Sequence, residues 1–79
     1  DPAAARARYV IQIAAFSDPD AAADLVRVLR RRYPEYPARV VTRSGLHRVW
    51  LGGWADRAAA ESVLVIVRHR YPDAWIATP

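Results

Sequence analysis

The hexapeptide RRRYPE at residues 30–35 returns as RHRYPD at residues 68–73, and this repeated stretch decides the fold. Shifting the chain by the same 38 residues aligns further identical or similar pairs, which are Asp18 with Asp56, Ala22 with Ala60, Ile13 with Leu51, Phe16 with Trp54 and Leu29 with Val67. A repeat of this length predicts two halves, about residues 9–43 and 46–78, that form the same supersecondary unit.

The first half is expected to contain a strand, a helix and a second strand. Residues 9–16, YVIQIAAF, are β-branched and aromatic and predict the first strand. Asp18 precedes a proline, so it predicts a helix N-cap, and Pro34 stops that helix. Residues 38–42 predict a short strand, and residues 43–45 a turn.

The second half repeats these elements. We expect a strand over residues 47–51, a helix capped by Asp56 and running to about Arg70, and a last strand over residues 74–77. Apolar residues at helical spacing predict the core stripes, which are Ala21, Leu25, Val28 and Leu29 in the first helix and Ala60, Val63, Leu64 and Val67 in the second.

The resulting order β-α-β-β-α-β predicts an α+β fold over residues 9–79, with residues 1–8 as a linker. Two helices are too few to cover both faces of a four-stranded sheet. We therefore expect a split-βαβ sandwich of the ferredoxin or RNP type, in which both helices cover one face of an antiparallel sheet and leave the other face open.

Composition narrows the function classes. The chain has 79 residues, 12 Arg and no Lys against 8 acidic residues, and its net charge of +4 suits an acidic polymer; Arg-rich, Lys-free usage with 16 Ala is also typical of high-GC codon bias. The lack of Cys excludes disulfides and thiolate metal sites, and no apolar run is long enough for a transmembrane helix. A start at Asp1-Pro2 predicts a longer parent polypeptide that carries an anchor, a signal peptide or an enzymatic domain upstream.

Strand alternation predicts which side chains the open face carries. If Ile11 and Ile13 face the helices, the open face receives Val10, Gln12 and Ala14 from the first strand, Arg48 and Trp50 from the third, and Trp75 from the last. Amide, guanidinium and indole groups together suit a polymer of sugars or bases, because indole stacks on either and the polar groups supply directed hydrogen bonds.

The sequence does not predict catalysis, a metal or a cofactor. His47 and His69 lie 22 residues apart on different elements, and the chain has no Cys and only two Glu, whereas a zinc site needs three or four converging ligands. Asp18 and Asp56 occupy equivalent positions before two helices, which explains both as N-caps and not as a catalytic carboxylate pair.

Residues 9–77 resemble the SPOR domain. That family opens with an aromatic-x-x-Gln-hydrophobic-Gly-Ser-Phe strand, and its second half opens with an aromatic-Arg-Val-x-hydrophobic-Gly-Pro-Phe strand. The matching positions are Tyr9, Gln12, Phe16, Arg48, Val49, Gly52 and Ala60. The departures are Ala14-Ala15 for Gly-Ser, Gly53-Trp54 for Pro-Phe, and His47 for the aromatic residue.

This resemblance implies noncatalytic binding of bacterial peptidoglycan, in particular of glycan strands that lack stem peptides. It implies a glycan on the open sheet face, with Gln12 and Arg48 among its contacts. It further implies a periplasmic or envelope location, a parent protein that the domain targets to the division septum, and a monomer that does not bind nucleic acid.

Two other functions remain open from the residues alone. An RRM-type RNA-binding module shares the element order and an open sheet, although residues 47–51 lack the aromatic-rich pattern of such modules. A dimerisation domain could use an edge strand or the apolar residues Val65 and Ile66. RNA binding falls steeply with salt, whereas stacking on sugars changes little, so salt dependence separates these functions.

Overall fold

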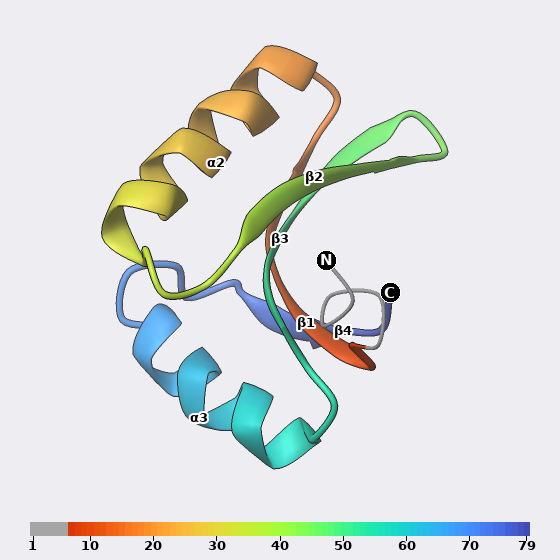
Figure 1. Cartoon of the computed structure of the whole chain (residues 1–79). Coiled ribbons are helices and arrows are strands. Elements are labelled where there is room, and N and C mark those ends of the chain that lie inside the picture. Colours follow the sequence, from red (N-terminus) through yellow and green to blue (C-terminus); the bar gives the residue numbers. More distant parts are fainter. Residues whose placement is uncertain (1–6) are drawn as a thin grey trace.

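The computed structural model describes residues 7–79 and contains the six elements in the predicted order (Figure 1). They are β1 (Tyr9–Phe16), α2 (Pro19–Arg32), β2 (Ala38–Arg43), β3 (Leu46–Trp54), α3 (Arg57–Val67) and β4 (Trp75–Ala77). The predicted α+β class is confirmed. Of the predicted linker, residues 1–6 lie outside the described residues, and Arg8 donates its backbone N–H to the carbonyl of Trp54 at 3.0 Å. No helix of the described part is long and apolar enough to span a bilayer.

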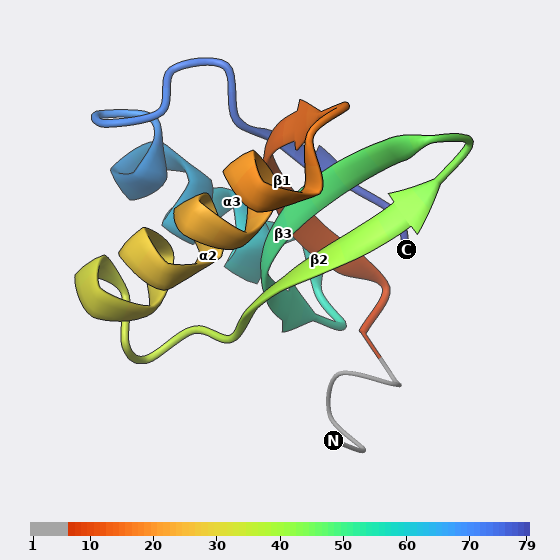
Figure 2. The same cartoon turned by 90° about the horizontal axis from the view of Figure 1, so that it is seen from above.

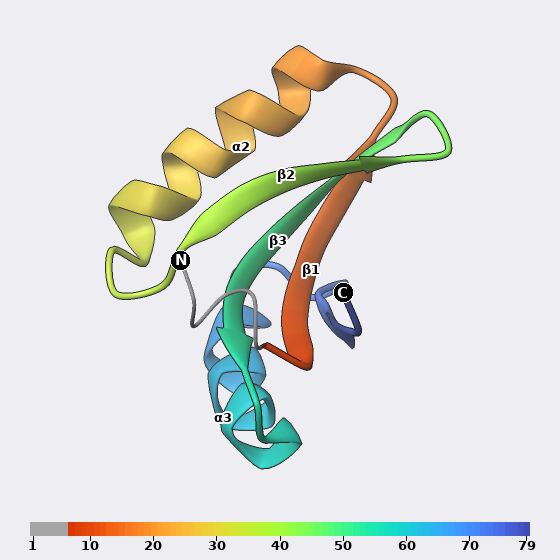
Figure 3. The ribbon, with the colours of Figure 1, turned by 45° about the vertical axis from the view of Figure 1, so that its right-hand side comes forward.

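The four strands form one antiparallel sheet in the order β2-β3-β1-β4. Both helices lie on the same side of this sheet, where α2 packs over β1, β2 and β3, and α3 packs over β1, β3 and β4 (Figures 1 and 2). The sheet is strongly twisted, and the β2–β3 hairpin projects beyond the end of β1 (Figure 3). No helix of residues 7–79 covers the opposite side, which we call the open face.

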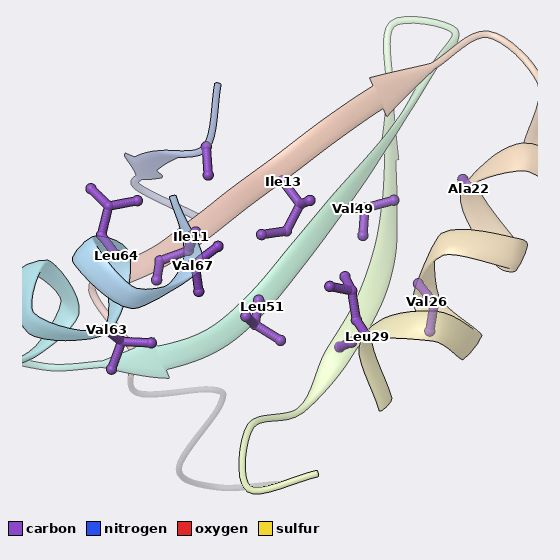
Figure 4. Close-up of a cluster of buried hydrophobic side chains, with 12 residues drawn as sticks. Ile11, Ile13, Ala22, Val26, Leu29, Val49, Leu51, Val63, Leu64 and Val67 are labelled. Carbon is purple, nitrogen blue, oxygen red and sulfur yellow. The ribbon is translucent and has the colours of Figure 1, made fainter. Parts of the chain in front are cut away.

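The main core lies between the helices and the sheet (Figure 4). The predicted stripe of α3 is confirmed, because Ala60, Val63, Leu64 and Val67 are all buried. The predicted stripe of α2 is confirmed for Leu29, which is buried, and for Leu25, which packs against the core; in place of Ala21 and Val28, the other buried residues are Ala22 and Val26. This helix has apolar residues around a wide arc, and its packing against three strands, not its periodicity, selects the part of the arc that turns inward.

Each helix begins at the predicted cap. The Asp18 carboxylate accepts a hydrogen bond from the backbone N–H of Asp20 at 2.9 Å, and the Asp56 carboxylate accepts one from Ala58 at 3.1 Å. Such bonds satisfy backbone donors that the first turn of a helix leaves unpaired. At the other end, α3 stops at Val67, before the predicted Arg70, and turns follow.

The repeated hexapeptide joins each helix to the strand that follows it. The guanidinium of Arg30 donates to the carbonyl of Ala38 at 3.3 Å, and that of Arg68 donates to the carbonyl of Ala74 at 2.9 Å. The tyrosines that follow, Tyr33 and Tyr71, pack against the core in both halves. The repeat thus encodes the same connection twice.

Two glycines have positive φ angles for different reasons. Gly45 (φ +77°) follows Ser44 (φ +54°) in the β2–β3 turn, where both residues adopt the left-handed conformation of a type I′ hairpin. Gly52 (φ +72°) lies in β3 beneath the indole of Trp54, and a Cβ there would overlap that ring. Trp54 in turn packs against Tyr36, with 5.7 Å between the ring centroids.

Gly52→Ala is expected to destabilise the fold more than Gly45→Ala. Both variants force alanine into a left-handed conformation, which costs about 1–2 kcal/mol. Only Gly52→Ala also displaces the Trp54 ring, which adds about 1–3 kcal/mol of overpacking. Urea denaturation measures both free energies of unfolding, and equal losses in the two variants would contradict this account of Gly52.

Candidate functional site

The open face is organised around one row of side chains that crosses all four strands. The strand register pairs Gln12 of β1 with Trp75 of β4 on one side and with Trp50 of β3 on the other. Trp50 in turn pairs with Arg39 of β2. Directly paired residues of antiparallel strands share a face, so these four side chains lie on the open face in the order Trp75, Gln12, Trp50, Arg39.

Gln12 is held in one orientation by its neighbours. Its side chain is 7% exposed, and its Oε1 accepts a hydrogen bond from the Trp50 indole N–H at 3.1 Å. The Arg48 guanidinium donates to the same oxygen at 3.5 Å. No buried side-chain nitrogen or oxygen among the described residues lacks a partner, and Gln12 Nε2 makes no hydrogen bond within them. The amide thus uses its acceptor for Trp50 and Arg48, and its two N–H donors have no hydrogen-bond partner within residues 7–79.

Trp50 supports Gln12 and offers no bare stacking surface. It is 3% exposed and packs with Val10, Ala77 and Val41 in a small second core. The guanidinium carbons of Arg39 and Arg43 lie 5.6 and 5.3 Å from the centroid of its ring. The expectation that a sugar stacks on Trp50 is wrong for this conformation, because these cations cover the ring.

Val10 and Ala14 also depart from their expected places at the site. Val10 lies on the open face but is fully buried in the second core, so no ligand reaches it. Ala14 pairs with the core residue Val49, because a bulge at Ile13 interrupts the alternation of β1. The prediction that Ala14 shares the face of Gln12 is therefore wrong.

The same bulge brings Ala15 to the open face. Ala15 pairs with Arg48 and is exposed. It is the second residue of the Ala14-Ala15 pair, and it therefore lies next to the Arg48 side chain on the surface that Gln12 and Trp75 share. Sequence alternation alone places it on the helix side.

Trp75 is the exposed indole of the open face. It is 47% exposed on the edge strand β4 and pairs with Gln12, which places it on the open face, as strand alternation predicted. Beside it lies a hollow of about 260 Å³ that reaches from the β2–β3 turn to the chain end after β4. The hollow is lined by Gln12, Arg43, Ser44, Arg48, Trp50, Trp75, Ala77 and Thr78.

Arg39 and Arg43 also lie at this site, although strand alternation alone did not predict it. Both point to the open face with Val41, because they alternate along β2 with Ala38, which lies in the main core. In the β2 sequence ARVVTR, the two arginines lie one and five positions after Ala38. Once Ala38 is known to face the core, alternation places both arginines on the open face. Together with Arg48 they place three cations on one sheet face.

The histidines lie away from this arrangement. His47 Nδ1 and Thr42 Oγ1 form a hydrogen bond of 2.8 Å across the β2–β3 hairpin, and His69 is exposed after α3. Over residues 7–79, no three His, Cys, Asp or Glu side chains converge as metal ligands would.

A model of the family described as the SPOR domain matches residues 5–78. The fold is also similar to the solution structure of the peptidoglycan binding domain of the B. subtilis cell wall lytic enzyme CwlC. The TM-score is 0.73 at 22% identity, over 92% of this chain and 90% of that one. No curated protein sequence matches the chain significantly.

The Gln12–Trp50 hydrogen bond is expected to stabilise the fold. Gln12→Leu leaves the buried indole N–H without an acceptor, which costs about 1–3 kcal/mol. In that background Trp50→Phe removes no hydrogen bond, so it is expected to cost less than in the parent chain. Urea denaturation of the four proteins measures this coupling, and strictly additive losses would show that the bond contributes nothing.

Proposed function

The chain belongs to the SPOR domain family, and from this premise we propose that it binds the glycan strands of bacterial peptidoglycan on its open face. The observation that carries the proposal is the fixed amide of Gln12. This residue and Arg48 match the family pattern, and the structure joins their side chains by a hydrogen bond at the centre of the open face. The fold likeness to the peptidoglycan binding domain of CwlC supports the same ligand.

The site offers hydrogen-bond donors to a ligand. Gln12 presents its amide N–H groups, and Arg39, Arg43 and Arg48 carry only donors. A glycan of N-acetylated sugars supplies the complementary acceptors in its amide carbonyls and hydroxyl oxygens. Trp75 supplies an exposed indole against which the C–H face of a sugar ring stacks.

Binding on this face requires no catalysis. Hydrolysis of a glycosidic bond generally uses two carboxylates that flank the bond, and the four strands contain no Asp or Glu. We therefore propose a binding module that places a larger envelope protein on its substrate. The sheet face is preformed, so binding orders few side chains.

The preferred ligand in this proposal is a glycan strand without stem peptides. A stem peptide on the lactyl group needs space where the sugar lies against the sheet and the projecting β2–β3 hairpin. Amidases produce bare strands at the division septum, so this preference directs the parent protein to that site in the periplasm.

Sedimentation with purified sacculi tests the proposal. Sacculi treated with an amidase are expected to pellet more of the chain than untreated sacculi, both at low and at physiological salt. RNA binding predicts instead an affinity for RNA that falls steeply over this range of salt. If neither preparation pellets the chain, peptidoglycan is not its ligand.

Self-association is the alternative that a specific observation favours. Val65 and Ile66 on α3 are adjacent aliphatic residues with 64% and 59% exposure, so association of two chains through α3 would remove apolar surface from water. A doubled mass in sedimentation equilibrium, lost in Val65→Ser/Ile66→Ser, supports dimerisation through α3. A single mass equal to that of the monomer excludes it at the concentration used.

Arg48→Ala is expected to weaken binding to amidase-treated sacculi by about 1–3 kcal/mol, because it removes a charged hydrogen-bond donor. Arg31→Ala, which removes an exposed cation from α2 on the other side of the sheet, is the matched control and is expected to bind like the parent. Circular dichroism checks that both variants fold. Equal binding by Arg48→Ala and the parent would place the site elsewhere.

Ala15→Ser is expected to strengthen binding. The exposed Ala15 lies opposite Arg48 and occupies the second position of the family's Gly-Ser pair. A hydroxyl there adds one hydrogen bond to the ligand, worth about 0.5–1.5 kcal/mol. Ser17→Ala, in the loop after β1, controls for the general effect of changing a hydroxyl; unchanged affinity in Ala15→Ser would show that the glycan does not reach this position.

A further inference from the structure

Charge is segregated between the two sides of the sheet. The strands carry Arg39, Arg43 and Arg48 on the open face and no carboxylate. The ion pairs of the described residues lie on the helices, where Arg27 pairs with Asp24 and Arg57 with Glu61. The three arginines of the open face therefore have no carboxylate partner within residues 7–79.

Arg39 and Arg43 are held in place by an aromatic ring. Their guanidinium carbons lie 5.6 and 5.3 Å from the centroid of Trp50, whose own position is fixed by the hydrogen bond to Gln12. A ring attracts a guanidinium but satisfies none of its five N–H donors. Arg43 lines the hollow beside Trp50, and Arg39 lies over the same ring, so both carry donor groups for an anion on this part of the open face.

A planar guanidinium fork fits a carboxylate better than it fits a hydroxyl or an amide, because it forms two parallel charge-assisted hydrogen bonds. In the glycan of the proposed function, the lactyl group is a carboxylate only when the stem peptide has been removed. While the stem peptide is attached, the lactyl carbonyl is a neutral amide. Hydrolysis of that amide leaves a carboxylate with one negative charge.

We propose that Arg39 and Arg43 bind the free lactyl carboxylate of a glycan strand that has lost its stem peptide. Bare strands are then selected both by recognition of the carboxylate charge and by steric exclusion of the stem peptide. This inference rests on the proposed function and adds to it a specificity-determining pair of residues on β2, distinct from Gln12 and Arg48.

The test compares two soluble forms of the same bare glycan by isothermal titration calorimetry. One form has free lactyl carboxylates, and in the other these groups have been coupled to methylamine to give neutral amides. The methylamide is small, so it removes the charge and adds little bulk. The parent chain is expected to bind the carboxylate form about tenfold more tightly, as for a charge-assisted bidentate pair.

Two double variants of equal net charge complete the test. Arg39→Gln/Arg43→Gln is expected to bind both glycan forms with the lower affinity. Arg31→Gln/Arg32→Gln removes the same charge from the exposed end of α2 and is expected to keep the tenfold preference. Thermal denaturation checks that both variants fold.

The outcomes separate this inference from the proposed function. Equal binding of both glycan forms by the parent would overturn the charge recognition and leave glycan binding intact. A preference that survives in Arg39→Gln/Arg43→Gln would also overturn it, because other residues would then read the carboxylate. If the parent binds neither form, the proposed function fails and this inference fails with it.

Discussion

The arrangement of the open face depends on the buried amide of Gln12. Gln12 lies on β1, the strand that pairs with both β3 and β4, and its carbonyl oxygen must find donors because the side chain is nearly inaccessible to water. Trp50 and Arg48, both on β3, supply them. This single constraint fixes the Trp50 ring, over which the guanidinium groups of Arg39 and Arg43 lie.

The helix side and the open face of the sheet have separate tasks. The main core, the two capped helices and the repeated Arg-Tyr connections lie on the helix side and hold the strands in register. The open face keeps a small second core around Val10 and Trp50, and above it a surface of cations with one exposed indole at Trp75. The open face thus contributes to stability through its second core and the Gln12–Trp50 hydrogen bond, whereas its exposed cations and Trp75 contribute little to the core.

Much of this structure could be predicted from the sequence, because both halves of the repeat contain the same helix caps and strand patterns. Asp18 and Asp56 gave the helix starts, and alternation placed Gln12, Arg48 and Trp75 on one face. The predictions that were wrong concern features that depend on tertiary structure. The bulge at Ile13 moves Ala15 to the open face and Ala14 away from it, and no residue type in YVIQIAAF requires a bulge. The burial of Val10 and Trp50 depends on neighbours from other strands, and Arg39 and Arg43 needed the β2–β3 register.

The most direct test of the central claim follows the three tryptophan indole N–H signals by NMR during titration with soluble glycan strands that lack stem peptides. Trp75 lies at the exposed edge of the open face and Trp50 beneath its cations, whereas Trp54 packs against the main core on the helix side. A ligand on the open face is predicted to shift the signals of Trp75 and Trp50 and to leave that of Trp54 in place. Shifts confined to Trp54 and to the amides of α3, with Trp75 unmoved, would contradict the account.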